Sequence, residues 1–499
     1  MTLFLYWAEQ LLVALVLLLY AFSLLWIFIF CLYQGRLAWA AKAAAKPEKA
    51  PLANTELPKV TIQLPLYNEP YVVERLLEAV MQLSYPKDKL EVQVLDDSSG
   101  AALKTTQNLV AHYQEKGCPI RLLQRSNRKG FKAGALKHGL QQAEGELIAI
   151  FDADFIPQKD WLLQTVPHFT SKEIGLVQTR WGHLNRKQSI LTKVIGFALD
   201  IHFLMEQKGR YAQQHLMAFN GTAGIWRKRC ILDAGNWESD TLAEDLDLSV
   251  RAQMKGWKFK FLENVVTPAE LPVTIAALRS QQFRWNKGGA ENFQKLFEKI
   301  AQSKQLTKKQ KLYASFHLLG SSMHLPILAL VLLSVPITVI QHHFPEFRSL
   351  FQVFSIFFVS TFLLFFMYWP VYRNKRPFQP KQLLDYTLHF IQFYAIIMGF
   401  SAYNAKAVWL GHRRTNSPFI RTPKFNLNTK TPQQHAYIHP LPFSELRVEM
   451  LLTAYIIAGL LYCLSQWSLS NLSMLPLLLM ALWGLLVHIY LARNPEKAL

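Results

Sequence analysis

Leu147-Ile148-Ala149-Ile150-Phe151-Asp152-Ala153-Asp154 is the stretch that decides the fold of the central part of this chain. Its apolar residues run directly into two acids, and Pro157 follows closely, which indicates a buried strand that ends in a turn. Side chains two apart on a strand point the same way, so Asp152 and Asp154 can aim both carboxylates at one point. Such a pair suits a hard divalent cation, and two solvated turn acids are the alternative that the stretch alone leaves open.

The composition indicates a soluble domain set between membrane segments. The chain has 499 residues, of which 51% are hydrophobic, and the apolar residues are clumped rather than spread. The stretch from Leu11 to Tyr33 contains no charged residue, and a span of about 20 apolar residues crosses a bilayer. By contrast, residues 55–299 have the composition of an ordinary globular domain.

The formal net charge of +20 is concentrated beside the apolar segments. This placement follows the positive-inside rule and favours anionic lipid and phosphorylated substrates as partners over nucleic acid. The basic residues concerned are Arg36, Lys42, Lys46, Lys49, Lys304, Lys308, Lys309, Lys311, Arg373, Lys375, Arg376 and Lys381.

The four cysteines, Cys31, Cys118, Cys230 and Cys463, lie far apart in the sequence. They show neither a metal-binding spacing nor a disulfide framework, so we expect free thiols in a reducing compartment. The first apolar run is too long for a signal peptide and is expected to be a retained membrane anchor.

Strands and helices alternate in the central domain, which predicts a mainly parallel, Rossmann-like α/β sheet with helices on both faces. Ligands of such sheets bind beyond the carboxyl ends of the strands, where Asp96, Asp97, Asp152 and Asp154 all fall. The strands are predicted at residues 60–64, 90–95, 120–124, 147–151 and 176–179, with a helix at 71–83.

The charge pattern predicts five membrane crossings, with the central domain and the long polar loop on the cytoplasmic side. Basic residues flank the apolar segment 383–410 on both sides, so it is predicted to be interfacial or re-entrant, with a sixth crossing as the alternative. The predicted divisions are a membrane helix at 1–37, a linker at 38–57, the soluble domain at 58–274, amphipathic interfacial helices at 275–311, two crossings within 312–372, the segment 383–410, a cytoplasmic loop at 411–440 and two crossings within 446–492.

Further motifs lie downstream of the two acids. Residues 127–134 form a basic stretch with glycines, and residues 218–224 contain glycines that permit close backbone approach to a ligand. Glu244 and Asp245 open a helix, where placement beside the helix dipole is a purely structural alternative. The motif Gln281-x-x-Arg284-Trp285 follows, and anchoring at a membrane interface is the alternative for its tryptophan.

In this order, the motifs resemble those of the integral-membrane family 2 glycosyltransferases of the cellulose synthase type. The stretch Ser417-Pro418-Phe419-Ile420-Arg421-Thr422-Pro423-Lys424 is similar to the gating loop of that family, and residues 219–224 resemble the branch of glucomannan and xyloglucan-backbone synthases. The resemblance covers roughly residues 58–430. It implies a GT-A-like cytosolic domain joined to five or six membrane helices.

The resemblance also implies roles for the donor side. Asp152 and Asp154 would hold Mg²⁺ or Mn²⁺ against the diphosphate of a UDP- or GDP-linked sugar. Asp97, with Asp96 beside it, would contact the base or ribose of the nucleotide. Lys132 would approach the phosphates, and an exposed surface lysine is the alternative.

On the acceptor side, Asp245 would be the general base for the acceptor hydroxyl, with Glu244 beside it, in a single displacement with inversion. The resemblance places Gln281, Arg284 and Trp285 along the acceptor, with Arg284 also neutralising diphosphate charge. Phe419, Thr422 and Lys424 would close over the nucleotide as a mobile loop. The sequence departs from the family at Ala243, where a threonine is usual, so an orienting hydroxyl is lost.

Three functions are consistent with these features. A processive synthase that extends a β-glycan and exports it is favoured, and a non-processive enzyme that glycosylates one lipid acceptor is the second. A transporter or scaffold that merely binds nucleotide is disfavoured, because a binding module has no need of Glu244 and Asp245. The sequence does not indicate the sugar, the base, or any accessory subunit.

Overall fold

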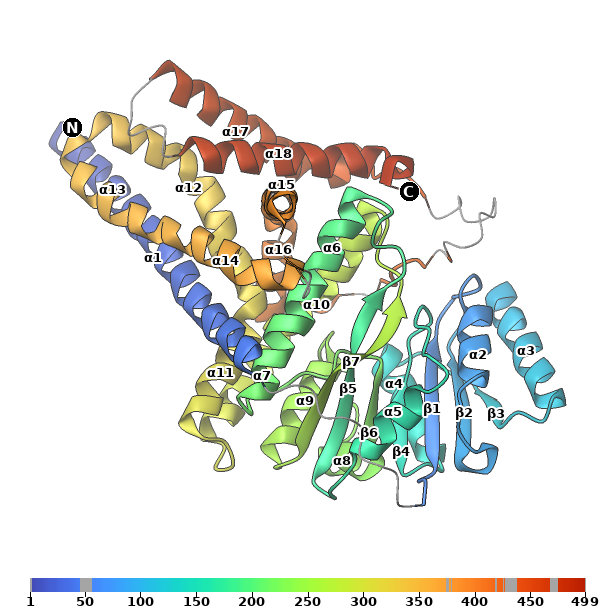
Figure 1. Ribbon diagram of the computed structural model, residues 1–499. Coiled ribbons are helices and arrows are strands. Elements are labelled where there is room, and N and C mark those ends of the chain that lie inside the picture. Colours follow the sequence, from blue (N-terminus) through green and yellow to red (C-terminus); the bar gives the residue numbers. More distant parts are fainter. Residues whose placement is uncertain are drawn as a thin grey trace.

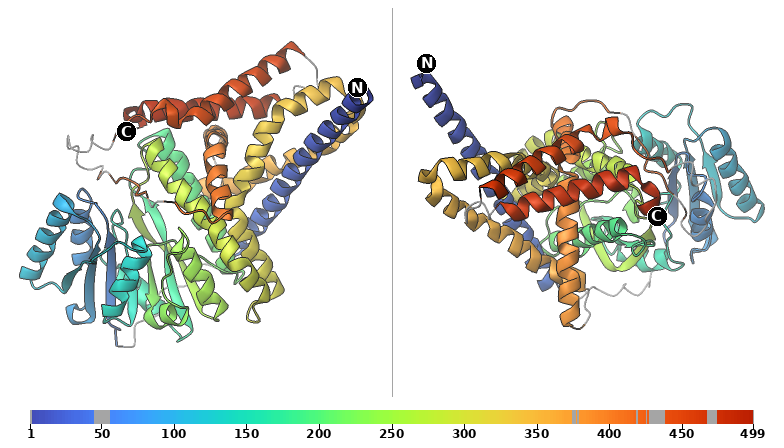
Figure 2. Two further views of the ribbon diagram at one scale, coloured as in Figure 1. Left: turned by 180° about the vertical axis from the view of Figure 1, so that it is seen from behind. Right: turned by 90° about the horizontal axis from the view of Figure 1, so that it is seen from above.

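The structure is a computed structural model that describes residues 2–44, 56–373, 377, 379–417, 420–424, 426, 438–466 and 474–498. It consists of a sheet domain and a group of long helices that lie against one side of it (Figures 1 and 2). Within the described residues the sheet has seven strands in the order β3-β2-β1-β4-β6-β5-β7. Their bounds are β1 Val60–Leu66, β2 Leu90–Asp96, β3 Ile120–Leu123, β4 Leu147–Ile150, β5 Ile174–His183, β6 Gly224–Arg227 and β7 Lys258–Ala269.

The sheet is mainly parallel, as predicted. Strand β1 lies between β2 and β4 and pairs in parallel with both, and β5 pairs in parallel with β7. Strand β6 is antiparallel to its neighbours β4 and β5. The carboxyl ends of β1, β2 and β4 therefore meet at one edge, which is where the sequence places its acids.

Helices cover both faces of this sheet, because the strands are apolar on both sides. On one face, α2 and α3 pack Leu76 and Val110 into a core that also contains Trp161 of α5. On the other face, α4 and α9 contribute Leu136 and Leu248 to a second core. The helices of this domain are α2 Val73–Met81, α3 Gly100–Glu115, α4 Phe131–Gln142, α5 Trp161–Thr165, α6 Ile190–Ile201, α7 Lys208–Ala212, α8 Lys228–Asp233 and α9 Glu244–Met254, with a π-helix at His202–Gln207 between α6 and α7.

Five helical segments of the described chain are long and apolar enough to cross a membrane. Their exposed surfaces are apolar, as shown by Leu11 and Leu451, which are 72% and 71% exposed. Exposed apolar surface on this scale suits contact with lipid or with another protein. The segments are Phe4–Ala43, Lys308–His343, Ser349–Arg373, Arg447–Ser465 and Leu475–Arg493, and they fit a multi-pass membrane protein.

Outside the sheet domain, the helices are α1 Thr2–Ala43, α10 Ile275–Gln302, α11 Lys308–Leu318, α12 His324–His343, α13 Arg348–Ser355, α14 Val359–Arg373, α15 Pro380–Gly399, α16 Ser401–His412, α17 Arg447–Ser465 and α18 Leu475–Arg493. Helices α15 and α16 are bent by 52° at their junction, a geometry that suits a broken span or a re-entrant loop. Both predictions for the segment 383–410 therefore remain open.

Two boundaries differ from the prediction. Helix α1 continues to Ala43, into the segment 38–57 that was predicted as a linker, because alanine and lysine after Leu37 favour the helix. Helix α11 begins at Lys308 and runs on into α12 as one candidate span, so the first candidate span after the sheet domain starts inside the segment 275–311. Strands β6 and β7 are further elements that the sequence pattern did not predict.

Helix α1 packs closely on the sheet domain. It lies against α7 and the π-helix (Figure 1), and a Cβ added at Gly209 of α7 would lie 2.4 Å from the carbonyl oxygen of Leu37. Gln34 of α1 also donates a hydrogen bond of 2.7 Å to Glu206. The first candidate membrane helix and the sheet domain are therefore joined by direct contact.

A similar close approach joins two helices of the membrane part. A Cβ added at Gly484 of α18 would lie 1.8 Å from the carbonyl oxygen of Ala395 in α15. Small residues at such crossings let helix backbones approach each other in a membrane.

We expect Gly484→Ala to push α15 and α18 apart and to destabilise the protein by about 1–3 kcal/mol, measured as a lower Tm in detergent. Gly320→Ala is the matched control, because the nearest atom to a Cβ there is 4.0 Å away. An unchanged Tm for the Gly484 variant would contradict the close approach.

Candidate active site

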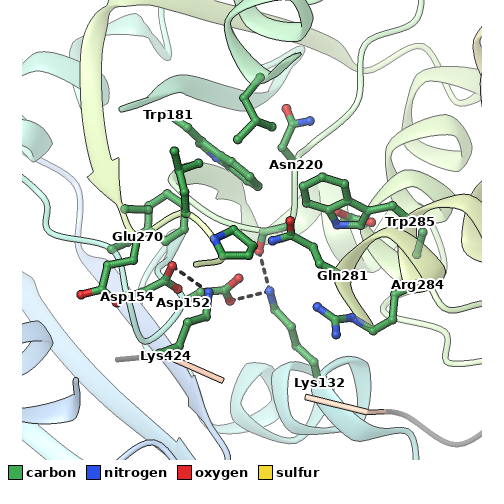
Figure 3. A pocket seen from close by; sticks show the side chains of 18 of the residues that line it. Lys132, Asp152, Asp154, Trp181, Asn220, Glu270, Gln281, Arg284, Trp285 and Lys424 are labelled. Carbon is green, nitrogen blue, oxygen red and sulfur yellow. Dashed lines mark hydrogen bonds and ion pairs between the residues drawn. The ribbon is translucent and has the colours of Figure 1, made fainter. Parts of the chain in front are cut away.

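Two adjoining pockets lie at the carboxyl ends of the strands, where the acids were predicted to converge. Lys132, Asp152, Asp154, Arg284 and Lys424 line both of them. The first also has Trp181, Asn220, Glu244, Asp245, Glu270, Gln281 and Trp285 in its wall (Figure 3). The second is completed by Tyr67, Glu69, Asp97, Arg128, Arg421 and Thr422.

The acids after β4 each pair with a lysine. Asp152 forms an ion pair of 2.5 Å with Lys132, and its backbone N–H donates to Oγ1 of Thr222. Asp154 is almost fully buried, and its Oδ2 lies 2.7 Å from Nζ of Lys424 (Figure 3). Both carboxylates thus face the pocket, as the spacing of two residues on a strand predicts.

These acids fit a divalent cation. The second oxygen of Asp154, Oδ1, is buried and accepts no hydrogen bond from the described residues. A buried carboxylate oxygen without a partner is costly, and a hard cation is the partner that such an oxygen prefers. Asp152 and Asp154 are therefore the residues of this pocket best placed to hold a metal.

A second acidic group is already neutralised. The carboxylate oxygens of Glu238, Asp240 and Asp247 lie within 4.8 Å of one another. However, Nζ of Lys295 lies 2.6 Å from Glu238, 2.6 Å from Asp240 and 2.9 Å from Asp247. The lysine ammonium supplies the positive charge that a metal would bring.

Glu244 and Asp245 enter the pocket from the first turn of α9. Burial, reinforced by the Glu244 carboxylate, raises the pKa of Asp245 to about 7, although the Lys132 ammonium lowers it. Burial also raises the pKa of Glu244. A carboxylate with a pKa near neutral pH suits a general base, since it is both ionised and basic enough to accept a proton.

Gly221 allows Asp245 and Lys132 to approach each other. Its φ of +80° lies in the left-handed region, and a Cβ there would lie 3.0 Å from Oδ2 of Asp245. Its carbonyl oxygen accepts a hydrogen bond of 2.9 Å from Lys132. Burial lowers the pKa of Lys132, but Asp152, Glu244 and Asp245 outweigh it, so the pKa is raised and the side chain stays a cation.

Helix α10 brings Gln281, Arg284 and Trp285 to the opposite wall of the pocket (Figure 3). Oε1 of Gln281 is buried and accepts no hydrogen bond from the described residues, so it is available to a sugar hydroxyl. The indole rings of Trp285 and Trp181 line the same pocket from α10 and β5. Flat aromatic faces with amide groups between them suit a sugar ring.

The second pocket is built around Asp97. Its carboxylate accepts hydrogen bonds from Arg125 in a bidentate pair, and the same arginine donates to the backbone oxygens of Lys129 and Phe131. Asp97 therefore fixes the loop before α4 as well as lining the pocket. Asp96 lines neither pocket: it is buried, and its Oδ1 accepts a hydrogen bond from the backbone of Ser98.

The loop after α16 reaches over the second pocket. Arg421 pairs with Glu69 at 2.5 Å, and Arg284 donates a hydrogen bond of 3.0 Å to Oγ1 of Thr422. Burial raises the pKa of Glu69 to about 7, although Arg421 and Lys424 favour the carboxylate. Thr422 and Lys424 line this pocket, whereas Phe419 lies outside the described residues.

Several pocket residues were not singled out from the sequence. Glu270, at the end of β7, pairs with Arg75 at 2.8 Å and lies beside Asp154 (Figure 3). Arg125 lines neither pocket but holds the carboxylate of Asp97, and it was missed because it follows β3 without a recognisable motif. The alternating Lys258-Phe259-Lys260-Phe261 could have revealed β7, and with it the place of Glu270 at the same edge of the sheet.

The fold and this site define the class of protein: a GT-A-like glycosyltransferase domain with apolar helices that fit a membrane. Residues 58–288 match the family described as glycosyltransferase like family 2.

Its relatives include proteins named for polysaccharide synthesis. Probable glucomannan 4-beta-mannosyltransferase 7 of Oryza sativa subsp. japonica is 42% identical over 285 residues, which cover 56% of this chain and 48% of the relative. Glucomannan 4-beta-mannosyltransferase 1 of the same species is 40% identical over 296 residues, which cover 58% of this chain and 57% of the relative. The chain thus spans about half the length of the curated relatives it matches.

A solved structure shares the fold. The mannosyltransferase PcManGT from Pyrobaculum calidifontis, solved in complex with GDP-Man and Mn²⁺, aligns with a TM-score of 0.54 at 18% identity. The alignment covers 80% of this chain and 100% of that chain. At this level of identity the likeness concerns the fold alone.

Proposed function

We propose that this protein transfers mannose from a nucleotide sugar to the end of a growing β-glycan. One observation carries the proposal: three kinds of group needed for inverting transfer face one pocket. These are a metal-binding acid pair (Asp152, Asp154), a buried acid with a pKa near 7 (Asp245) and a wall suited to a sugar ring (Gln281, Trp285). Residues from β4, α9 and α10 supply these groups, and a nucleotide-binding module would need only the first.

On the donor side, the protein would stabilise the leaving diphosphate by positive charge. Mg²⁺ or Mn²⁺ held by Asp152 and Asp154 would supply part of that charge when bound. Lys132, Arg284 and Lys424 line the same pockets and would contribute the rest. Tyr67 and Asp97 in the second pocket would receive the nucleoside, while Asp96 supports the strand end.

On the acceptor side, Asp245 would take the proton of the attacking hydroxyl. Its carboxylate lies in the pocket wall beside Asn220 and Trp285, so an acceptor sugar stacked on the indole would present its hydroxyl there. The hydroxyl oxygen would attack the anomeric carbon as the bond to the diphosphate breaks, and the configuration would invert. Gln281 would orient the acceptor through its free oxygen.

The relatives favour mannose and a β-glycan product. They are named glucomannan 4-beta-mannosyltransferases and are about 40% identical over the matched region. GDP-mannose, the donor named for the protein of similar fold, is the first donor to test. UDP-linked hexoses are the comparison, because the aspartate at position 97 accepts hydrogen bonds from several bases.

A further cavity favours a polymer over a single lipid acceptor. It has a volume of about 520 Å³ and extends from Asp245 and Trp285 to Phe30 of α1, His324 of α12 and Phe393 of α15. A passage from the base to the candidate membrane helices would let a growing chain leave through them, which supports processive synthesis with export. Basic residues beside the spans, such as Lys308 and Arg373, support a cytoplasmic catalytic side and contact with anionic lipid.

Replacing the base tests the catalytic assignment. Asp245→Asn should lower kcat by about 10²–10⁴-fold, because a general base contributes roughly that factor, while GDP binding persists. The purified full-length protein would be incubated with GDP-mannose and Mn²⁺, and released GDP and product length would be measured. Continued transfer by the variant would refute the role of Asp245, and release of single mannosyl-lipids would favour the lipid-acceptor reading.

The pH dependence follows from the raised pKa of Asp245, about 7. Below that pH the carboxyl group is increasingly protonated and cannot accept a proton, so kcat should fall with falling pH, about tenfold per unit. Lys132→Met removes a cation that lowers this pKa, so the acid limb of the profile should move to higher pH. A profile of kcat that is flat from about pH 5 to about pH 8, a range that includes the pKa of about 7, would contradict the assignment.

Metal removal tests the acid pair separately. EDTA should abolish transfer, and Mn²⁺ or Mg²⁺ should restore it, since the leaving diphosphate would otherwise lack a counter-ion. Asp154→Asn should weaken Mn²⁺ binding measured by calorimetry in the absence of donor. Full activity in EDTA would show that Asp152 and Asp154 do not act through a metal.

A further inference from the structure

We propose that Lys287 and Glu291, a buried ion pair on α10, set the position of the catalytic loop before α9 relative to the loop after α16. Neither residue lines a site pocket, so both act through the residues they hold. The activity readout below rests on the proposed function, whereas the structural readout does not.

Lys287 is among the largest fully buried side chains of the described chain, with only 1% of its surface exposed. Lysine is almost never buried unless it is paired. Its ammonium group donates to the backbone oxygen of Thr415 and, at 2.7 Å, to Oγ of Ser417, and it lies 3.3 Å from Oε1 of Glu291. The three N–H donors thus have three oxygen partners, of which two belong to the loop after α16.

Glu291 holds the other loop. Its second oxygen, Oε2, accepts a hydrogen bond of 2.7 Å from the backbone N–H of Leu242, three residues before Asp245. The neighbouring Asn292 donates a hydrogen bond of 2.9 Å to the backbone oxygen of Ala243. One carboxylate therefore links the lysine to the segment that carries the base.

The start of α9 depends on this support. Ala243 occupies the N-cap position, and no side chain caps the helix there, since alanine has no oxygen to offer. Gly288 allows the close approach, because a Cβ there would lie 2.7 Å from the backbone nitrogen of Ala243. Helix α10 thus supports the N-terminal end of α9, which has no side-chain cap of its own.

The same face of α10 also contacts the loop beyond residue 419. Ser280 and Arg284 donate hydrogen bonds to the backbone oxygen of Ile420, at 3.0 and 2.6 Å. Positions 280, 284, 287 and 291 follow the spacing of one helix face. Helix α10 also packs along α16 (Figure 1), so one helix contacts the segment before Asp245, the loop after α16 and the pocket wall. A shift of the loop would therefore change the position of Asp245.

Four variants of the full-length protein test this proposal: Lys287→Met, Glu291→Gln, the double variant, and Lys299→Met as control. Lys299 lies on the same helix but is exposed. Backbone hydrogen exchange would be followed by mass spectrometry without substrate, and kcat and GDP affinity would be measured with GDP-mannose and Mn²⁺.

We expect Lys287→Met to quicken exchange in residues 411–417 and also in 242–246, which it does not touch. Its kcat should fall roughly 10- to 100-fold with GDP affinity unchanged, the effect of misplacing a catalytic group by about 1 Å. The double variant should be no worse than Lys287→Met, since the pair acts as a unit. Lys299→Met should match the wild type.

Faster exchange confined to 411–417, or an unchanged kcat, would overturn the proposal, because Lys287 would then be only a local anchor. If Lys287→Met does not fold, Glu291→Gln serves as the test instead, because glutamine keeps the shape of the side chain and an acceptor for the N–H of Leu242. Unchanged hydrogen exchange in both segments of this variant would overturn the proposal. A wild type that is inactive with GDP-mannose would count against the proposed function, and the exchange results would still decide on the pair.

Discussion

A concentration of negative charge in one poorly solvated pocket is the constraint on which this structure depends. Asp152, Glu244 and Asp245 lie around the single ammonium of Lys132, which keeps its proton because of them. Asp154 has its own lysine, Lys424, on the loop after α16. Bringing these acids together without the cations of α4 and of the loop after α16 would be strongly unfavourable, so the sheet edge, α4 and the loop must all be in place for the pocket to exist.

The framework of the domain was predictable because it is local in sequence. Strands β1, β2 and β4 are apolar runs that end in acids or turn residues, and the parallel sheet follows from their alternation with helices. Strand β6 was missed because its four residues carry too little pattern to distinguish. Strand β7 was missed although its first residues alternate between lysine and phenylalanine.

The pocket was only partly predictable. Asp152, Asp154, Asp245 and Arg284 stand in motifs whose order carries information, and all of them line the pockets. Asp96 looks equivalent to Asp97 in the sequence, yet adjacent residues on a strand point to opposite sides, and only Asp97 reaches the pocket. The pairs Arg421 with Glu69 and Glu270 with Arg75 join segments far apart in the chain, so no local pattern could reveal them.

The contact between α1 and α7 couples the first candidate membrane helix to the sheet domain. Because the Gly209 backbone is pressed against Leu37, and Gln34 is bonded to Glu206, the sheet domain is not suspended on a flexible tether. In a membrane, this contact would hold the pocket at a fixed height and tilt relative to the lipid. A change in membrane thickness or tension that tilts the first helix would then be transmitted to the π-helix, whose His202 bonds to Asn220 in the pocket wall.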